Sequence, residues 1–290
     1  MDTTPIFHIA FYRFTPVAAP QTLAASLRLL AADLLGSILV ATEGINGVLA
    51  GSAGALARFE QALTATGFAE GAFAGLAFKR SACTTPPFAR LKVHVKPEIV
   101  ALGEPGVTGV PADAATTTAP RQPGEPCRER RSGSVVSPQQ WRELLAADNV
   151  VVLDNRNSFE YQLGRFRSAI DPQVENFRDF SAYLAVNAPA WKAAGKRVAM
   201  YCTGGIRCEK TSARMQDLGL DVVELEGGIL NYFQQMPDAD LDWQGECFVF
   251  DNRIALDTRL QETATTAEEV YLAPEDAWRL ARARRLDAAK

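Results

Sequence analysis

The segment with the clearest chemical character spans residues 198–214, VAMYCTGGIRCEKTSAR. An apolar run ends at Cys202, two glycines follow, and Arg207 stands at the start of a predicted helix. Glycines let the backbone curl so that successive N–H groups point at one atom, and a helix N-terminus adds partial positive charge. Such a loop would hold a thiolate or persulfide, lower the pKa of the thiol and make Cys202 a nucleophile stabilised by Arg207. The residues between them, which would wrap around the sulfur, are Thr203, Gly204, Gly205 and Ile206.

The distribution of histidine limits how Cys202 could be activated. The chain contains two histidines, His8 and His94. A Cys–His dyad in the second half of the chain is therefore excluded, as is a facial-triad iron site there. The alternative is a buried structural cysteine beside a tight turn, but two glycines and an arginine directly before a helix argue against it.

Three more residues are candidates for the same site. Cys208 could resolve a persulfide on Cys202 or form a disulfide with it, although packing between the helix and a sheet is the interpretation we favour. Asp154 and Arg156 follow a predicted strand and could form the edge of the pocket. For both of them we favour an ion pair that holds the following turn.

Composition indicates an ordinary globular chain. With 290 residues, 47% of them hydrophobic and 22% charged, the chain is long enough for two domains. Its net charge of −4 means that any RNA would need a local basic patch. We expect no secretory signal, because the first residues have no basic region followed by a long apolar core. We expect no membrane span, because no run of about 18 apolar residues occurs. Five scattered cysteines without a CxxC pair fit reduced thiols in the cytoplasm, and we predict no metal site.

The first hundred residues alternate predicted strands and helices. Helices are expected over 20–35 and 52–66, where apolar residues recur at helical spacing. Strands are expected over 6–14, 37–41, 76–82 and 89–100, and a turn leads into another strand over 42–51. The order β-α-β-β-α-β with an extra strand predicts an α+β sandwich of the ferredoxin-like or acylphosphatase-like type over residues 1–102.

The second half predicts a different architecture after a flexible linker or insertion over 103–133, rich in Gly, Pro and Thr. Ser137, Pro138 and Gln140 form a capping box. Strands then alternate with helices, which predicts a doubly wound parallel sheet over 134–257 with the Cys202 loop beyond a strand end. Residues 258–290 form a tail that could be helical, for which we favour a solvated or frayed state over contact with RNA or a partner.

A basic strip lies near the end of the first domain. No Asp or Glu occurs between Lys79 and Lys96, and Phe88 is interleaved. Phosphate contacts plus base stacking are what recognition of single-stranded RNA requires, although a solvated strand face would look similar. The candidate RNA-binding residues are Lys79, Arg80, Arg90, Lys92, His94 and Lys96.

Several motifs resemble known families. LDNRNSFEYQLGRFRSAI, through Asp154, Arg156 and Glu160, and YCTGGIRC are similar to the rhodanese pattern, with Cys202 as the persulfide-bearing residue. The four residues between Cys202 and Arg207 suit sulfur, whereas five would be the phosphatase spacing. With EGINGV, PFARLKVHVKPEIVALG, LEGGILNYF and GECFVFDNRIAL, the chain resembles the rhodanese-containing tRNA uridine hydroxylases, which join an acylphosphatase-like domain to a rhodanese domain.

That resemblance implies a cytoplasmic enzyme that uses molecular oxygen as co-substrate to hydroxylate carbon 5 of the wobble uridine 34, with the tRNA anticodon loop as its partner. No flavin, haem or non-haem iron motif is apparent. Two departures are a longer stretch over 105–133 and the absence of a cysteine-rich segment after CFVFD. The alternatives are a plain sulfurtransferase acting through Cys202 and a non-catalytic tRNA-binding protein; the oligomeric state stays open.

Overall fold

A computed structural model describes residues 5–84, 86–110 and 135–287 of the chain. The chain divides into two compact units. Of the described residues, 5–101 and 108–110 belong to the first unit, and 102–107 and 135–287 belong to the second. The predicted linker lies outside the described residues from position 111 to its end, as does Cys127.

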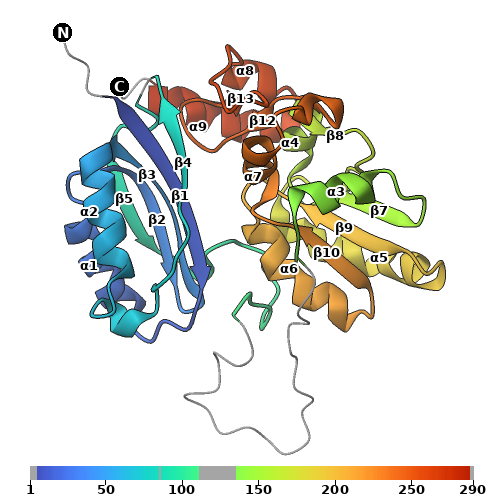
Figure 1. The fold of residues 1–290 in the computed structure, drawn as a ribbon, viewed down its shortest axis with the longest axis horizontal. Coiled ribbons are helices and arrows are strands. Elements are labelled where there is room, and N and C mark those ends of the chain that lie inside the picture. The colour runs from blue at the N-terminus through green and yellow to red at the C-terminus, as the bar shows by residue number, and fades with distance from the viewer. Residues whose placement is uncertain (1–4, 85, 111–134, 288–290) are drawn as a thin grey trace, which may run out of the picture. The chain divides into compact units, whose positions relative to one another are not determined.

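The first unit is a five-stranded sheet with two helices on one face (Figure 1). Along the chain its main elements are β1 (Ile6–Phe14), α1 (Pro20–Leu30), β2 (Leu35–Ala41), β3 (Gly44–Ser52), α2 (Ala53–Thr64), β4 (Lys79–Cys83) and β5 (Leu91–Val95). This order confirms the predicted β-α-β-β-α-β arrangement with an extra strand. The helix predicted to reach residue 35 ends at Leu30, and the strand expected over 89–100 spans five residues.

Strand alternation divides the sheet of the first unit into two faces. The strand order is β4-β1-β3-β2-β5, in which β5 runs parallel to β2 and the other pairs are antiparallel. Ile9 and Phe11 of β1 point into the core, where they join Leu27 of α1 and Phe59 of α2. The residues that alternate with Ile9 and Phe11 along β1 therefore point to the face away from the helices.

The second unit is built around a four-stranded parallel sheet in the order β6-β10-β9-β7. Its strands are β6 (Val135–Val136), β7 (Val150–Asp154), β9 (Arg197–Tyr201) and β10 (Asp221–Leu225), connected through helices that include α3 (Pro138–Leu145), α4 (Ser158–Leu163), α5 (Phe180–Ala193) and α6 (Ile206–Asp217). The central strands β9 and β10 are apolar along most of their length, as strands buried on both faces must be. The predicted parallel rhodanese-type sheet is confirmed.

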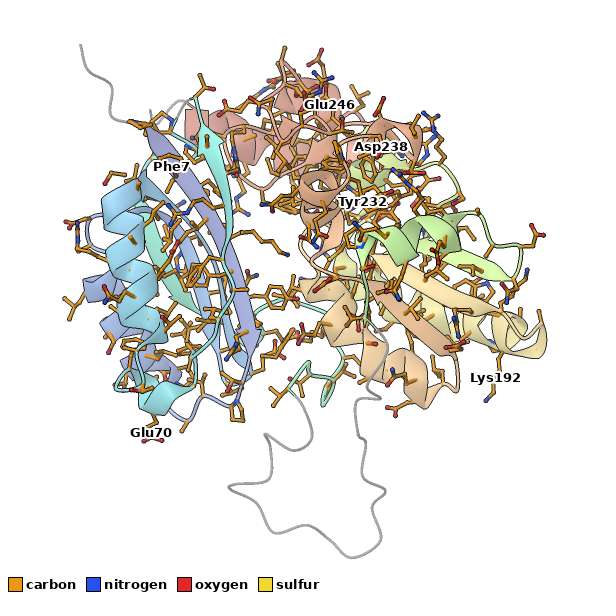
Figure 2. The ribbon with its side chains drawn as sticks, in the orientation of Figure 1. Phe7, Glu70, Lys192, Tyr232, Asp238 and Glu246 are labelled. Atoms are coloured by element: carbon orange, nitrogen blue, oxygen red, sulfur yellow. The ribbon has the colours of Figure 1, made fainter. Side chains whose placement is uncertain are left out.

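Helices cover both faces of this sheet (Figure 1). On one face Trp141 of α3 packs with Ala199, Tyr201 and residues of α7 (Gly228–Gln235). Tyr232 of α7, labelled in Figure 2, belongs to the same layer. On the other face Thr211 of α6 contacts the Met200 sulfur at 3.5 Å. The two helices that follow β9 and β10 thus lie on opposite faces of the sheet. Because these two strands run parallel, both helices begin at the same edge.

The second unit differs from the sequence prediction at residues 102–107 and in its tail. Residues 102–107 pack with the second unit, because Glu104 accepts a hydrogen bond from Ser181 at 2.8 Å and pairs with Arg214 at 2.8 Å. The tail is folded rather than frayed over its described residues, and part of it is buried in the second unit. It forms α8 (Ala267–Val270) and α9 (Ala277–Asp287), and Val270 joins a cluster with Phe159 and Phe248.

Candidate active site

Cys202 lies directly after β9, in a loop whose backbone is turned toward its sulfur. The residue is 1% exposed, and the Gly205 N–H donates a hydrogen bond to Sγ at 3.1 Å. Gly205 has φ of 98°, a left-handed conformation that favours glycine, and it serves as the N-cap of α6. The loop therefore passes from strand to helix within four residues, and the N–H groups of Gly205, Arg207 and Cys208 bond the sulfur.

The N-terminus of α7 holds the outer side of the same loop. The Ile229 N–H donates to the Cys202 carbonyl at 3.0 Å, and the Leu230 N–H donates to the Thr203 carbonyl at 3.2 Å. Gly228 has φ of 68°, and a Cβ there would lie 2.4 Å from the Cys202 carbonyl oxygen. These two hydrogen bonds fix the backbone of the loop against the start of α7. The glycine at the end of the LEGG sequence allows this close approach between α7 and the loop. The sequence analysis assigned no role to it.

Arg207 is fixed by a buried carboxylate on α4. Its Nη1 lies 2.9 Å from Oε2 of Glu160, and its Nη2 lies 3.1 Å from Oε1. Glu160 has no exposed surface and also accepts the Asn157 N–H at 3.1 Å. A bidentate pair of this kind fixes the plane of the guanidinium. Glu160 appeared in the rhodanese pattern, but the pattern did not show what it binds.

The electrostatics of the loop favour a thiolate at Cys202. Burial opposes ionisation, but the Cys208 thiol, the charge of Arg207 and the backbone N–H groups of both residues lower the pKa of Cys202 to about 5. Burial and the neighbouring Cys202 raise the pKa of Cys208 well above its ordinary value. Cys208 therefore stays protonated and acts as a hydrogen-bond donor to Cys202, while Asn155 Nδ2 lies 4.0 Å from its sulfur.

Asp154 and Arg156 form a buried brace next to the loop. Arg156 donates to Asp154 at 2.8 and 2.6 Å and to the Gly164 carbonyl at 2.6 Å, and neither side chain is exposed. Tyr201, the residue before Cys202, donates to Asp154 at 2.7 Å. Side chains without exposed surface do not line an open pocket. The geometry supports the ion-pair interpretation, in which the brace holds the ends of β7 and β9 together.

An exposed aromatic ring adjoins Arg207. Phe250 is 60% exposed, and the Arg207 guanidinium carbon lies 5.6 Å from its ring centroid. The ring belongs to the turn between β12 (Cys247–Phe248) and β13 (Ala255–Leu256). The GECFVFDNRIAL motif contains it, but sequence reasoning gave Phe250 no role.

The structure does not bring the candidate RNA-binding residues together. Lys79 and Arg80 lie on β4, whereas Lys92 and His94 lie on β5, and these strands form opposite edges of the sheet. Arg80 pairs with Glu60 of α2 at 2.6 Å. Leu91 and Val93 face the core, so Lys92 and His94 point to the face without helices. Lys96, whose N–H bonds the Val40 carbonyl, continues this register.

The described residues form neither a metal-binding cluster nor a membrane-spanning helix. No group of three or more His, Cys, Asp or Glu side chains in that part of the chain is arranged to hold a metal ion. No helix there is long and apolar enough to cross a membrane. Cys202, Cys208 and Cys247 are free thiols.

Comparison with known proteins agrees with the two folds. Residues 6–99 match the UPF0176 acylphosphatase like domain, and residues 137–235 match the rhodanese-like domain. The chain thus joins an acylphosphatase-like domain to a rhodanese-like domain whose loop presents Cys202.

Similarity to curated proteins extends over most of the chain. The tRNA uridine(34) hydroxylase of Synechococcus elongatus is 45% identical over 87% of this chain and 86% of its own length. The proteins of that name from Nitrobacter winogradskyi and Deinococcus radiodurans are each 41% identical, over 92% and 87% of this chain and 98% and 76% of their own lengths. The chain belongs to the tRNA uridine(34) hydroxylase family.

Proposed function

We propose that this protein hydroxylates uridine 34 of tRNA at carbon 5, with molecular oxygen as co-substrate and Cys202 as the essential residue. The observation that carries the proposal is the pairing of family membership along most of the chain with a loop that favours the Cys202 thiolate. A thiolate is the nucleophilic form of cysteine. A tRNA substrate also fits the cytoplasmic location expected from the cysteine pattern.

In this proposal the loop residues have distinct roles. Cys202 provides the reactive sulfur, as a thiolate or as the persulfide that the family resemblance implies. The Gly205 N–H and Arg207 stabilise its negative charge. Glu160 positions Arg207, and Cys208 supplies a further hydrogen bond. Thr203, Gly204 and Ile206 complete the curve of the loop.

We assign phosphate contacts with the anticodon loop to the β5 edge of the first unit. Lys92 and His94 alternate along β5, Lys96 follows its last residue, and the side chains share the face that α1 and α2 do not cover. Arg90 precedes this strand and is exposed. Positive side chains spaced along a strand edge suit successive phosphates of an RNA backbone. Lys79 and Arg80 would contact RNA at most from the opposite edge.

Nucleoside mass spectrometry of tRNA tests the proposal. Cells that lack this protein would be complemented with the wild-type chain or with Cys202→Ala. We expect 5-hydroxyuridine-derived wobble nucleosides to disappear in the deletion strain and to return only with the wild-type chain. Unchanged nucleosides in all three strains would refute the tRNA assignment.

Sulfur transfer is the second candidate function, because the rhodanese-like match and the anion-holding loop would serve it unchanged. The purified protein would then move sulfur from thiosulfate to cyanide through Cys202. This activity would not require the first unit, so removal of that unit separates the two candidates.

A further inference from the structure

Phe250 occupies an unusual position for a large apolar side chain. It is 60% exposed, although its neighbour Phe248, two residues earlier, is 1% exposed. The exposed ring lies beside Arg207, whose charge helps to lower the pKa of Cys202. An isolated exposed apolar residue needs no explanation by itself. Its contact with the arginine of the reactive loop is the feature that points to a function.

The turn that carries Phe250 is rigidly held. The Val249 N–H donates to the Ile254 carbonyl at 2.8 Å, which closes the turn. Within the turn, Arg253 pairs with Asp251 at 2.7 Å, and these two side chains are 1% and 3% exposed. The hydrogen bond fixes the backbone before Phe250, and the buried ion pair fixes the backbone after it. The ring is therefore presented in a set position.

Packing of neighbouring aromatic rings also fixes the position of the Phe250 ring. Phe248 contacts Phe250 edge-on, with ring centroids 4.9 Å apart, and Phe248 also packs edge-on against Phe159 at 5.0 Å. Phe159 belongs to α4, the helix that carries Glu160. One helix thus supports both Phe250, through Phe248, and Arg207, through Glu160. The exposed ring and the reactive loop are parts of one rigid arrangement.

We infer that Phe250 is a substrate-binding residue on which the target pyrimidine base stacks beside Arg207 and the Cys202 loop. This inference rests on the proposed function, because it takes RNA as the substrate. Chemistry on a base requires that the base leave its stack, which removes its neighbours. An exposed aromatic side chain replaces one of those neighbours, as aromatic residues do in single-stranded RNA recognition.

The variants for the test are Phe250→Ala, Phe250→Trp and the control Trp278→Ala. Trp278 is another exposed aromatic of the same unit, at 53%, with an arginine over its ring at 4.5 Å. That arginine, Arg279, bonds Asn176 and the Glu175 carbonyl. Trp278→Ala therefore removes an equivalent ring–arginine contact away from the loop.

Three measurements would be made on the full-length protein. The first is kcat/KM for 5-hydroxyuridine formation in unmodified tRNA. The second is photo-crosslinking to an anticodon stem-loop RNA with 5-iodouridine at position 34, with the crosslinked residue located by mass spectrometry. The third is the pH profile of Cys202 alkylation, which reports whether the loop itself is intact.

We expect Phe250→Ala to lower kcat/KM by about 5-fold to 150-fold, the range for loss of one stacked base. Phe250→Trp should stay near wild type because it keeps the stacking surface, and Trp278→Ala should be unchanged. The crosslink should map to Phe250, and the alkylation profile should be the same in all variants. Equal rates for Phe250→Ala and Trp278→Ala, a crosslink elsewhere, or a loss that accompanies an altered alkylation profile would each overturn the inference.

The same measurements separate this inference from the proposed function. A crosslink at Phe250 without any 5-hydroxyuridine would support the stacking role and refute the hydroxylase. Hydroxylation at the wild-type rate by Phe250→Ala would support the hydroxylase and refute the stacking role of Phe250. RNA that neither crosslinks nor reacts would overturn both.

Discussion

At the residue scale, the charge state of Cys202 depends on groups from several parts of the loop. The pKa of its thiol is lowered to about 5 against the opposing effect of burial. Below this pH the sulfur is protonated and unreactive, and above it the thiolate predominates. We expect the rate of Cys202 alkylation by iodoacetamide to rise through a midpoint near pH 5 and to be level at neutral pH. Site-specific mass spectrometry would measure it.

Cys208 provides the control for this prediction. Because its thiol donates a hydrogen bond to Cys202, Cys208→Ala should move the alkylation midpoint to higher pH. Cys208→Ser keeps a donor of similar size and should shift the midpoint less. A midpoint that is the same in the alanine variant and the wild type would show that Cys208 only fills space.

Loss of Glu160 should destabilise the second unit. Glu160→Ala would leave the buried Arg207 guanidinium without its carboxylate, a change that costs about 3–5 kcal/mol in other buried pairs. Urea unfolding would measure the loss of free energy. The matched control is Glu268→Ala, which breaks the exposed pair with Arg284 at 2.9 Å and should cost less than about 1 kcal/mol. Similar losses in both variants would contradict a special role for Glu160.

The sequence predicted the residues of the site that lie close together in the chain and missed their distant partners. Cys202 and Arg207 share one short loop, so their spacing indicated their chemistry. Glu160 lies 47 residues before Arg207, and only the packing of α4 against the loop brings them together. Phe250 follows the loop by a similar separation. A single sequence carries no physical signal for contacts of this kind, because they depend on how elements pack.

At the element scale, the loop depends on a glycine in the next helix. Gly228→Ala would place a Cβ 2.4 Å from the Cys202 carbonyl oxygen, at a positive φ that disfavours alanine. We expect this variant to lose most Cys202 reactivity because the loop must move. Gly195→Ala is the control, since Gly195 also has positive φ but a Cβ there meets nothing within 4 Å. Its cost should be limited to about 1–2 kcal/mol, with normal Cys202 reactivity. Alkylation rates and thermal unfolding would be measured for both variants. They would distinguish the clash of a Cβ with the loop from the cost of a positive φ alone.

Element order was predictable from periodicity, but sheet order was not. Short apolar runs indicated the strands of the first unit, helical spacing of leucines indicated α1, and a candidate serine cap indicated α2. The basic strip over 79–96 is continuous in sequence, yet its two strands lie at opposite edges because β1, β3 and β2 stand between them. Strand pairing involves residues far apart in the chain. Basic residues that are close in the sequence therefore do not form one continuous surface on the sheet.

At the scale of the whole molecule, each unit has a hydrophobic core of its own. Ile9, Leu27 and Phe59 belong to the core of the first unit, and Trp141, Tyr201 and Tyr232 belong to that of the second. Every contact described for Cys202 and Arg207 comes from the second unit. The reactive loop should therefore form without the first unit, whereas recognition of tRNA in our proposal needs the β5 edge of that unit.

A fragment of residues 102–290 tests whether the second unit forms the reactive loop by itself and the first unit is needed for tRNA recognition. We expect it to keep the Cys202 alkylation midpoint near pH 5, because Glu160, Cys208 and the start of α7 are all present. Its kcat/KM for tRNA hydroxylation should fall by about 10-fold or more, because phosphate contacts supply much of the affinity for RNA. A fragment of residues 134–290 is the matched control: it also lacks Glu104 and should unfold at lower temperature, since the contacts with Ser181 and Arg214 are lost. If the 102–290 fragment hydroxylated tRNA as well as the full chain, the first unit would have no part in substrate binding, and the role of the β5 edge would have to be abandoned.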